Sequence, residues 1–285
     1  MLGYVCKYTP MELFEAMDTE ITRLEPSVTD FNHADTLMHA NICSYTKAVL
    51  EDVMEHDYEG VILTTCCDSI RRLYDTLKSQ FPDKFFFLLD IPRKFNDFAV
   101  TLYERQLKQM LTEYEAFSGK TLDLKRFVSM MQNKAALKKQ ENTRMSASAA
   151  SEKGNGQKLN IGIMGARCNN EIRQLLVDRG ANLLFDLTCT GLARDFSITE
   201  NQVLHSYAAA LLNQIPCMRM LKAANREHFL DGFTDRLDGI IYHTVKFCDS
   251  YSYEYADFRQ RLDLPILLVE TDSTRQCAGQ VRTRV

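Results

Sequence analysis

The sequence predicts an α/β protein with two parallel sheets. Short apolar segments alternate with longer amphipathic ones, as expected when strands and helices follow one another along the chain. The apolar segments are rich in Val, Ile, Leu and Phe and lack a helical period, which is typical of strands buried on both faces. A long polar region with helical period interrupts the alternation once, so we expect two lobes rather than one continuous sheet.

Seven apolar segments have the length of a strand and no helical period. We predict strands at residues 2–5, 60–65, 85–91, 159–164, 182–187, 239–247 and 265–270.

Amphipathic segments between these strands predict helices. They cover residues 41–55, 68–80, 169–179, 200–214, 218–229 and 250–262. A further helix is expected to begin at Thr9 or Pro10, because Thr9 suits a capping position, Pro10 suits the first turn and Glu12 follows at the spacing of a capping box.

The middle of the chain differs from both halves. Residues 93–140 have helical period without a strand, and residues 138–158, KKQENTRMSASAASEKGNGQK, are small and polar, as in an exposed linker. We therefore predict an N-terminal α/β lobe at 1–92, a helical insert and polar linker at 93–157, and a C-terminal α/β lobe at 158–285. Each lobe is expected to be a small flavodoxin-like parallel sheet, with a cleft between the two.

Composition excludes several classes of protein. Hydrophobic residues make up 45% of the 285 residues and charged residues 25%, which is ordinary for a folded chain and excludes general disorder. The net charge of −4 gives no basic surface for nucleic acid. No apolar segment approaches the roughly 20 residues that span a bilayer, and the first residues do not resemble a signal peptide. We expect a cytoplasmic protein.

Nine cysteines are the unusual feature of the composition. Disulfides are not expected in a cytoplasmic chain, so the thiols are either buried apolar side chains or ligands in metal or redox chemistry. Several of them follow predicted strands directly, at the sheet edge where α/β proteins bind ligands. These cysteines are Cys6, Cys66, Cys67, Cys189 and Cys248.

The spacing of these thiols bears on the metal. Thiolates suit iron–sulfur clusters, zinc or Cu(I). No CxxC pair of the kind that binds zinc occurs, whereas single cysteines at separate strand ends fit a cluster held between two lobes. Cys43 lies near the start of a predicted helix, where backbone N–H groups favour a thiolate. Inert core thiols and a zinc site remain the alternatives.

Nine short motifs occur in a recognisable order, and Arg226 follows the sixth of them. The chain thereby resembles the D-component family of 2-hydroxyacyl-CoA dehydratases, which includes benzoyl-CoA reductase subunits. The motifs are LGYVCKYTPMELFEAM, HANICSYTKAVLE, GVILTTCCDSIRRLYDTL, LDIPRK, FDLTCTGLARDF, IPCMRM, DGIIYHTVKFCDSYSYE, LPILLVETD and GQVRTR.

The resemblance implies an anaerobic, cytoplasmic lyase or oxidoreductase. Family members hold a 4Fe–4S cluster through three cysteines, pair with a related subunit or with a second copy, and receive one low-potential electron from an ATP-dependent activator protein. Transfer of that electron to the thioester carbonyl of an acyl-CoA gives a ketyl radical that loses the hydroxyl. The chain has no P-loop, which agrees with ATP binding by a separate protein.

Carried over to this sequence, the resemblance implies Cys43, Cys67 and Cys248 as cluster ligands. Cys66 directly precedes Cys67, so either of them could be the second ligand. This pair of adjacent cysteines is similar to that of relatives that hold a double-cubane cluster and reduce small molecules. Cys189 and Cys217 are expected to pack near the cluster or to be additional ligands. A non-catalytic iron–sulfur partner subunit is a further alternative, because relatives often extend beyond both ends of this chain.

Other residues have lesser expected roles, and we assign no catalytic residue. Asp68 and Asp249 are expected to be helix caps, and Cys168 and Cys277 to be ordinary thiols. Ser44 and Tyr45 are candidate hydrogen-bond donors to cluster sulfur. The turn at Gly162 and Gly165, which continues to Asn169 and Asn170, is either a tight turn or a site where backbone N–H groups bind phosphate. Arg282 and Arg284 bind the phosphates of CoA, bind a partner's carboxylates or are solvated.

Overall fold

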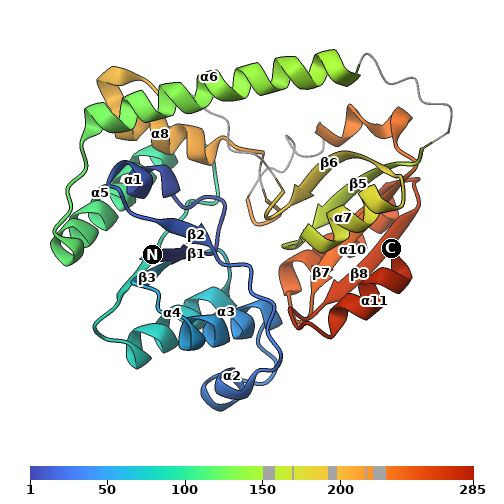
Figure 1. The fold of residues 1–285 in the computed structure, drawn as a ribbon, viewed down its shortest axis with the longest axis horizontal. Helices are drawn as coiled ribbons and strands as arrows, with labels where there is room; N and C mark the ends of the chain where they lie inside the picture. The colour runs from blue at the N-terminus through green and yellow to red at the C-terminus, as the bar shows by residue number, and fades with distance from the viewer. Residues whose placement is uncertain (150–157, 169, 192–197, 216, 221–228) are drawn as a thin grey trace.

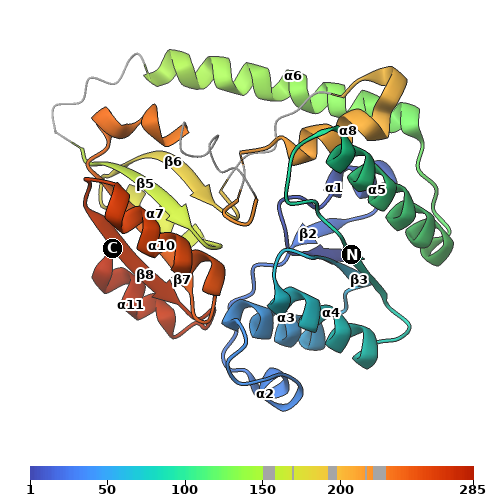
Figure 2. The same cartoon turned by 180° about the vertical axis from the view of Figure 1, so that it is seen from behind.

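The protein has two α/β lobes that lie side by side, as the sequence predicts (Figures 1 and 2). We describe a computed structural model in which residues 1–149, 158–168, 170–191, 198–215, 217–220 and 229–285 are placed. Each lobe contains a four-stranded parallel sheet with flanking helices. No helix in the described part of the chain is long and apolar enough to cross a membrane.

The N-terminal sheet has the strand order β2-β1-β3-β4. Its strands are β1 (Leu2–Tyr4), β2 (Ile21–Arg23), β3 (Gly60–Thr64) and β4 (Phe85–Leu89), all parallel. Three of these strands match the predicted ones. The sequence analysis missed β2, because this edge strand has only three residues and none of them is fully buried.

The C-terminal sheet repeats this order as β6-β5-β7-β8. Its strands are β5 (Asn160–Gly165), β6 (Asn182–Thr188), β7 (Gly239–Val245) and β8 (Ile266–Thr271), again all parallel. All four were predicted. In both sheets the first strand of the lobe lies between the second and the third, so the two lobes share one topology.

Most of the predicted helices are present; α2 and α11 were not predicted. Much of the predicted helix at 218–229 lies outside the described residues. The helices are α1 (Met11–Ala16), α2 (Asn32–Leu37), α3 (Ser44–Glu55), α4 (Asp68–Gln80), α5 (Asp97–Ser118), α6 (Leu124–Ala149), α7 (Asn170–Asp178), α8 (Val203–Leu212), α10 (Asp249–Arg261) and α11 (Cys277–Arg284), with 3-10 turns η1 (Glu200–Gln202) and η2 (Thr234–Arg236).

The predicted capping box of the first helix is wrong. Pro10 occupies the capping position of α1, no side chain caps this end, and the Thr9 hydroxyl has no hydrogen-bond partner among the described residues. The Thr9 N–H instead donates to the Cys6 carbonyl at 2.9 Å. A tight turn after β1 therefore places Thr9 one residue before the position from which its hydroxyl would cap.

The predicted linker is helical over its first part. Helix α6 continues to Ala149 and runs along one edge of both lobes (Figure 1). The segment up to Ala149 contains Ala, Lys, Gln and Glu, which favour helix, and no Gly or Pro occurs before Gly154. The absence of an apolar stripe was therefore a poor indicator of a linker here, since intrinsic propensity suffices to continue a helix that has already begun.

Three apolar clusters cover the sheet faces. One face of the N-terminal sheet packs against α1, α5, the start of α6 and α8, so α8 joins the N-terminal core although it follows β6 in sequence. The other face packs against α3 and α4, and this cluster continues into the C-terminal lobe beneath α10. The outer face of the C-terminal sheet packs against α7 and α11. The shared cluster fixes the carboxyl ends of both sheets close to each other.

Candidate metal centre

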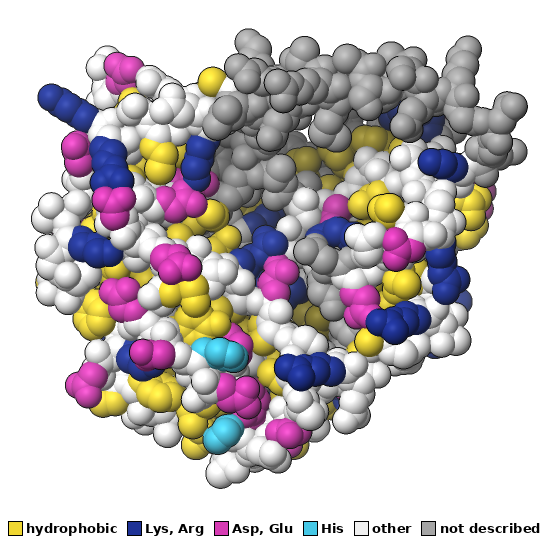
Figure 3. Space-filling model, viewed as in Figure 1, with side chains coloured by type: hydrophobic (Ala, Val, Ile, Leu, Met, Phe, Trp, Pro, Cys, Tyr) yellow, Lys and Arg dark blue, Asp and Glu magenta, His cyan; other side chains and the backbone are white. Residues whose placement is uncertain are grey.

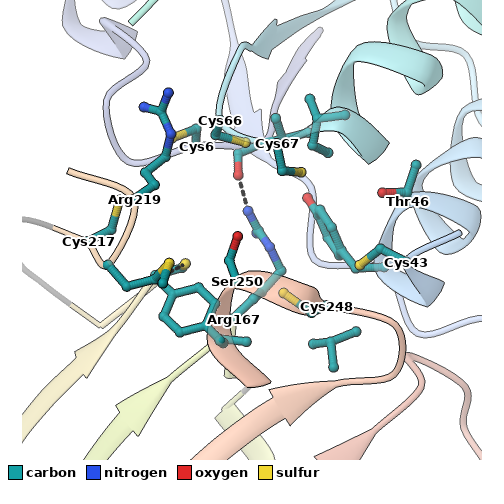
Figure 4. A pocket seen from close by; sticks show the side chains of 18 of the residues that line it. Cys6, Cys43, Thr46, Cys66, Cys67, Arg167, Cys217, Arg219, Cys248 and Ser250 are labelled. Atoms are coloured by element: carbon teal, nitrogen blue, oxygen red, sulfur yellow. Dashed lines mark hydrogen bonds between the residues drawn. The ribbon is translucent and has the colours of Figure 1, made fainter. Parts of the chain in front are cut away.

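A cavity of about 110 Å³ lies between the lobes at the carboxyl ends of the strands (Figure 4). Space-filling side chains show a hollow between the lobes in which Lys and Arg gather (Figure 3). Seven of the nine cysteines line the cavity, among them every cysteine that was predicted at a strand end. They are Cys6, Cys43, Cys66, Cys67, Cys189, Cys217 and Cys248.

Three of these thiols occupy the N-cap positions of three helices. Cys43 caps α3, Cys67 caps α4 and Cys248 caps α10, and we call them the cap thiols. None of the three side chains makes a full capping hydrogen bond, although backbone N–H groups of α3 and α10 lie close enough to Cys43 and Cys248 to stabilise a thiolate. The first N–H groups of a helix carry partial positive charge, so these positions favour the thiolate form that binds metals. The cap thiols are the three ligands that the resemblance implied.

Cys43 and Cys248 come from different lobes and face each other. Their thiols share a hydrogen bond, which together with the backbone N–H groups of Thr46 and Tyr45 lowers the pKa of Cys43 to about 7 although the side chain is buried. The pKa of Cys248 is raised, chiefly by the same hydrogen bond and then by burial. Cys43 is thus the thiol of this pair that favours the thiolate form, and Cys248 donates a hydrogen bond to it.

The remaining four thiols form a second thiol group, Cys6, Cys66, Cys189 and Cys217. The hydrogen bond with Cys6 lowers the pKa of Cys66, but Cys67 and burial raise it more, so the net direction is upward. Burial raises the pKa of Cys217 and raises that of Cys189 to about 11. The Cys189 sulfur lies 2.7 Å from the Tyr251 hydroxyl. These thiols stay protonated unless a metal or a cation compensates their charge.

Two arginines of the C-terminal half supply positive charge to the cavity. The guanidinium of Arg167 lies between the two groups of thiols in Figure 4 and stacks 4.0 Å from the centre of the Tyr45 ring. It donates to the carbonyls of Val5 and Leu24 in the other lobe. Arg219 donates through Nη2 to the Thr65 carbonyl at 3.0 Å. The sequence analysis singled out neither arginine, because no local pattern marks a side chain that reaches another lobe.

The expected donors to cluster sulfur are wrong. The Ser44 hydroxyl donates to the carbonyl of Lys246 at 3.3 Å, and the Tyr45 hydroxyl donates to the carbonyl of Leu24 at 2.8 Å. Both hydroxyls therefore add a second hydrogen bond to carbonyls that the Ser44 N–H and Arg167 already contact. The hydroxyl of Thr46 lies beside Cys43 instead (Figure 4).

The two aspartates that follow cap thiols are not caps. Asp68 and Asp249 are the first residues of α4 and α10, because the preceding cysteines take the capping positions. Their carboxylates remain in the first turn, where the helix dipole stabilises negative charge. Asp68 is exposed and lies 4.0 Å from Arg72 on the outer surface of α4.

The remaining expected features lie away from the cavity. Gly162 and Gly165 have packing roles, since a Cβ atom would lie 2.3 Å from the Phe185 ring in the first case and 2.1 Å from the His243 carbonyl in the second. Asn169 is outside the described residues. Arg282 lies 3.6 Å from Glu171, and Arg284 donates to the Leu268 carbonyl at 3.5 Å, both at the C-terminal helix.

Cys168 and Cys277 do not line the cavity, as the sequence analysis expected. Cys168 is fully buried against α7, and Cys277 donates to Asp272 at 2.7 Å.

The donor set fits a cluster better than a single ion. Within the described residues no three His, Cys, Asp or Glu side chains are arranged to hold one metal ion. The cysteines instead surround a space large enough for a group of several heavy atoms, and they come from both lobes. Thiolate is the ligand of iron–sulfur clusters, and the buried Nε and Nη1 of Arg219 have no partner in the described part of the chain. Soft donors and uncompensated cationic N–H groups together suit an anionic, sulfur-rich centre.

Comparison with known protein families identifies a family. The profile of the family described as 2-hydroxyglutaryl-CoA dehydratase, D-component, matches residues 6–147 and residues 129–285. The two matches together extend over nearly the whole chain. No curated protein sequence matches it.

Proposed function

We propose that this protein is the iron–sulfur subunit of a 2-hydroxyacyl-CoA dehydratase-type enzyme. The chain belongs to the 2-hydroxyglutaryl-CoA dehydratase D-component family, whose profile matches nearly all of it. One observation carries this proposal: three thiols, Cys43, Cys67 and Cys248, cap three helices around one cavity. The proposed ligands of a 4Fe–4S cluster are these cap thiols, and the cluster supplies one-electron chemistry at a Lewis-acidic iron when bound.

The protein's own residues have clear tasks in this function. The helix N-termini behind the cap thiols favour thiolates, so they lower the cost of assembling an anionic centre. Most of the surface that the cavity walls expose is apolar, although Lys7, Arg167 and Arg219 also line the cavity, and an apolar surface helps to keep water from a reactive site. Arg167 joins the lobes across the cavity through Val5 and Leu24 and balances negative charge there. A low-potential electron from an ATP-dependent activator and an acyl-CoA substrate complete the proposed system.

The number of thiols favours a second candidate function. Four cysteines besides the cap thiols line the same cavity, which is more than one cluster with three protein ligands requires. Cys66 contacts both Cys6 and Cys67 and so connects the two groups. A double-cubane cluster that reduces small molecules would use these additional thiols.

Metal analysis of anaerobically purified protein separates the candidates. We expect about four iron atoms and about four acid-labile sulfides per chain for the dehydratase-type cluster, and about eight iron atoms for the double-cubane form. A colourless protein that contains zinc and no iron would contradict both. Air exposure should bleach the visible absorbance of the iron-loaded protein.

Turnover separates a catalytic chain from a non-catalytic one. The iron-loaded chain is incubated with activator, ATP and a 2-hydroxyacyl-CoA, alone and with a related subunit, and loss of the hydroxyl is followed by mass spectrometry. Absence of product in both mixtures would leave an electron-carrying partner subunit as the function.

A further inference from the structure

The guanidinium of Arg219 is fixed at the edge of the thiol-lined cavity. It comes from the segment 217–220, and its Nη2 donates to the carbonyl of Thr65, the residue before Cys66. Thr65 is itself held in place, since its hydroxyl donates to Asp90 at 2.6 Å and accepts from the Ile91 N–H at 3.1 Å. Arg219 therefore has a rigid attachment on the N-terminal lobe.

The other side of the same guanidinium lacks partners. Nε and Nη1 are buried, and neither has a hydrogen-bond partner in the described ranges of the chain. Buried donors without acceptors are costly, and those of a charged group are more costly still. An arginine kept in this state is expected to have an acceptor that belongs to another molecule or group.

The surroundings define the chemistry of that acceptor. Arg219 lines the cavity together with Cys6, Cys66 and Cys217, and Figure 4 places it beside these thiols. Burial raises the pKa of Cys217, and the charges of Lys7 and Arg219 oppose that rise. Because sulfur is the main acceptor type on these walls, the chemistry of the cavity suits a sulfur-rich anionic group as the partner of Nε and Nη1.

The other cations near these thiols are already engaged. Arg167 donates to two backbone carbonyls and stacks on Tyr45, and Lys7 donates to the carbonyl of Ile215. Arg219 differs from these cations, because two of its buried N–H groups, Nε and Nη1, have no hydrogen-bond partner among the described residues.

We propose that Arg219 donates from Nε and Nη1 to anionic sulfur of the centre in the cavity and raises its reduction potential. This inference rests on the proposed function. A positive charge and N–H donors next to sulfur stabilise the added electron, so they favour the reduced form. The role is independent of whether the centre is a single or a double cluster.

The test compares three variants of the anaerobic, iron-loaded protein. Arg219→Gln removes the charge, Arg219→Lys keeps the charge without the planar fork, and Arg72→Gln removes an exposed arginine of the α4 surface that is paired with Asp75 at 2.9 Å. The measurements are iron per chain and the midpoint potential from a redox titration followed by electron paramagnetic resonance.

We expect Arg219→Gln to shift the ratio of reduced to oxidised centre at least tenfold towards the oxidised form at fixed potential, which is 59 mV for one electron. Arg219→Lys should shift it less, and Arg72→Gln should leave it unchanged. Wild-type iron content with an unshifted potential in Arg219→Gln overturns the inference, as does an equal shift in Arg72→Gln.

If Arg219→Gln loses its iron, its potential cannot be measured, and the test then depends on Arg219→Lys. Retained iron with a lowered potential in that variant supports donation by the planar N–H groups, because the charge is still present. Retained iron with an unshifted potential overturns it, and so does a folded Arg219→Lys protein without iron, because Arg219 is then needed for assembly of the centre rather than for its potential. Wild-type protein without iron removes the proposed function and this inference together, whereas a loaded wild type with no difference between variants removes the inference alone.

Discussion

The two lobes have the same strand order but contribute different groups to the cavity between them. After the third strand of each lobe the chain provides an equivalent thiol: Cys67 follows β3 and caps α4, and Cys248 follows β7 and caps α10. After the first strand they differ. The N-terminal lobe places Cys6 in the cavity, and the C-terminal lobe places Arg167 there.

This difference teaches how the cavity obtains its charge balance. The N-terminal lobe supplies four of the lining thiols, while the arginines of the cavity wall both come from the C-terminal half. A site built from the N-terminal lobe alone would have Lys7 but neither arginine to balance the charge of buried thiolates. The site is therefore a product of the interface, and either lobe by itself is incomplete.

Loss of either equivalent thiol should have the largest effect. We expect Cys67→Ser and Cys248→Ser each to lower iron from about four atoms per chain to fewer than one, because a hydroxyl is a poor ligand for iron–sulfur clusters. Cys277→Ser, whose thiol lies outside the cavity against Asp272, is the matched control and should keep its iron. Full iron content in both cavity variants would show that the lobes do not share a centre at these positions.

Removal of the arginine that joins the lobes comes next. Arg167→Met should lower the free energy of unfolding by about 4 kcal/mol, because the Val5 and Leu24 carbonyls lose a charged donor and the Tyr45 ring loses its cation. Urea denaturation measures this change. Arg72→Met, on the exposed surface of α4, should change stability by less than about 0.5 kcal/mol. If both variants lowered the free energy of unfolding by a similar amount, Arg167 would not stabilise the contact between the lobes.

A pH effect confined to the C-terminal lobe should be smaller. Burial lowers the pKa of His243 to about 4, so the folded protein keeps this imidazole neutral while the unfolded chain binds a proton below about pH 6.5. Because the unfolded state binds more protons in this range, stability falls as the pH falls. We expect His243 to account for a loss of about 2 kcal/mol between pH 7 and pH 5.

The variant His243→Gln should lose this part of the pH dependence in urea titrations at several pH values. His56→Gln replaces an exposed histidine of the N-terminal lobe and should keep the wild-type dependence. An unchanged slope in His243→Gln would show that the buried imidazole is not the titrating group.

The sequence was a good guide to local structure. Seven of the eight strands in the described residues, the main helices and the thiols at strand ends follow from patterns within a few neighbouring residues. Errors arose where local signals were weak or misleading: β2 is too short to show a pattern, the Thr9 hydroxyl does not cap α1, and α6 continues through a segment without an apolar stripe.

The candidate site was predictable only in part. Cys43, Cys67 and Cys248 could be named from motifs, and their place at helix starts follows from the positions of the strands before α4 and α10. Ser44 and Tyr45 were misassigned because their hydroxyls donate to carbonyls distant in sequence. No pattern within the chain could indicate that Arg167 and Arg219 reach the opposite lobe.

The sequence by itself determined the two parallel sheets, the family and the cysteines that follow the strands, because hydrophobic period, helix capping and motif order are local properties. Only the tertiary structure decided that seven thiols surround one cavity and that arginines of one half face thiols of the other. Those contacts join residues more than a hundred positions apart, and their geometry depends on how two cores pack rather than on any neighbouring residues.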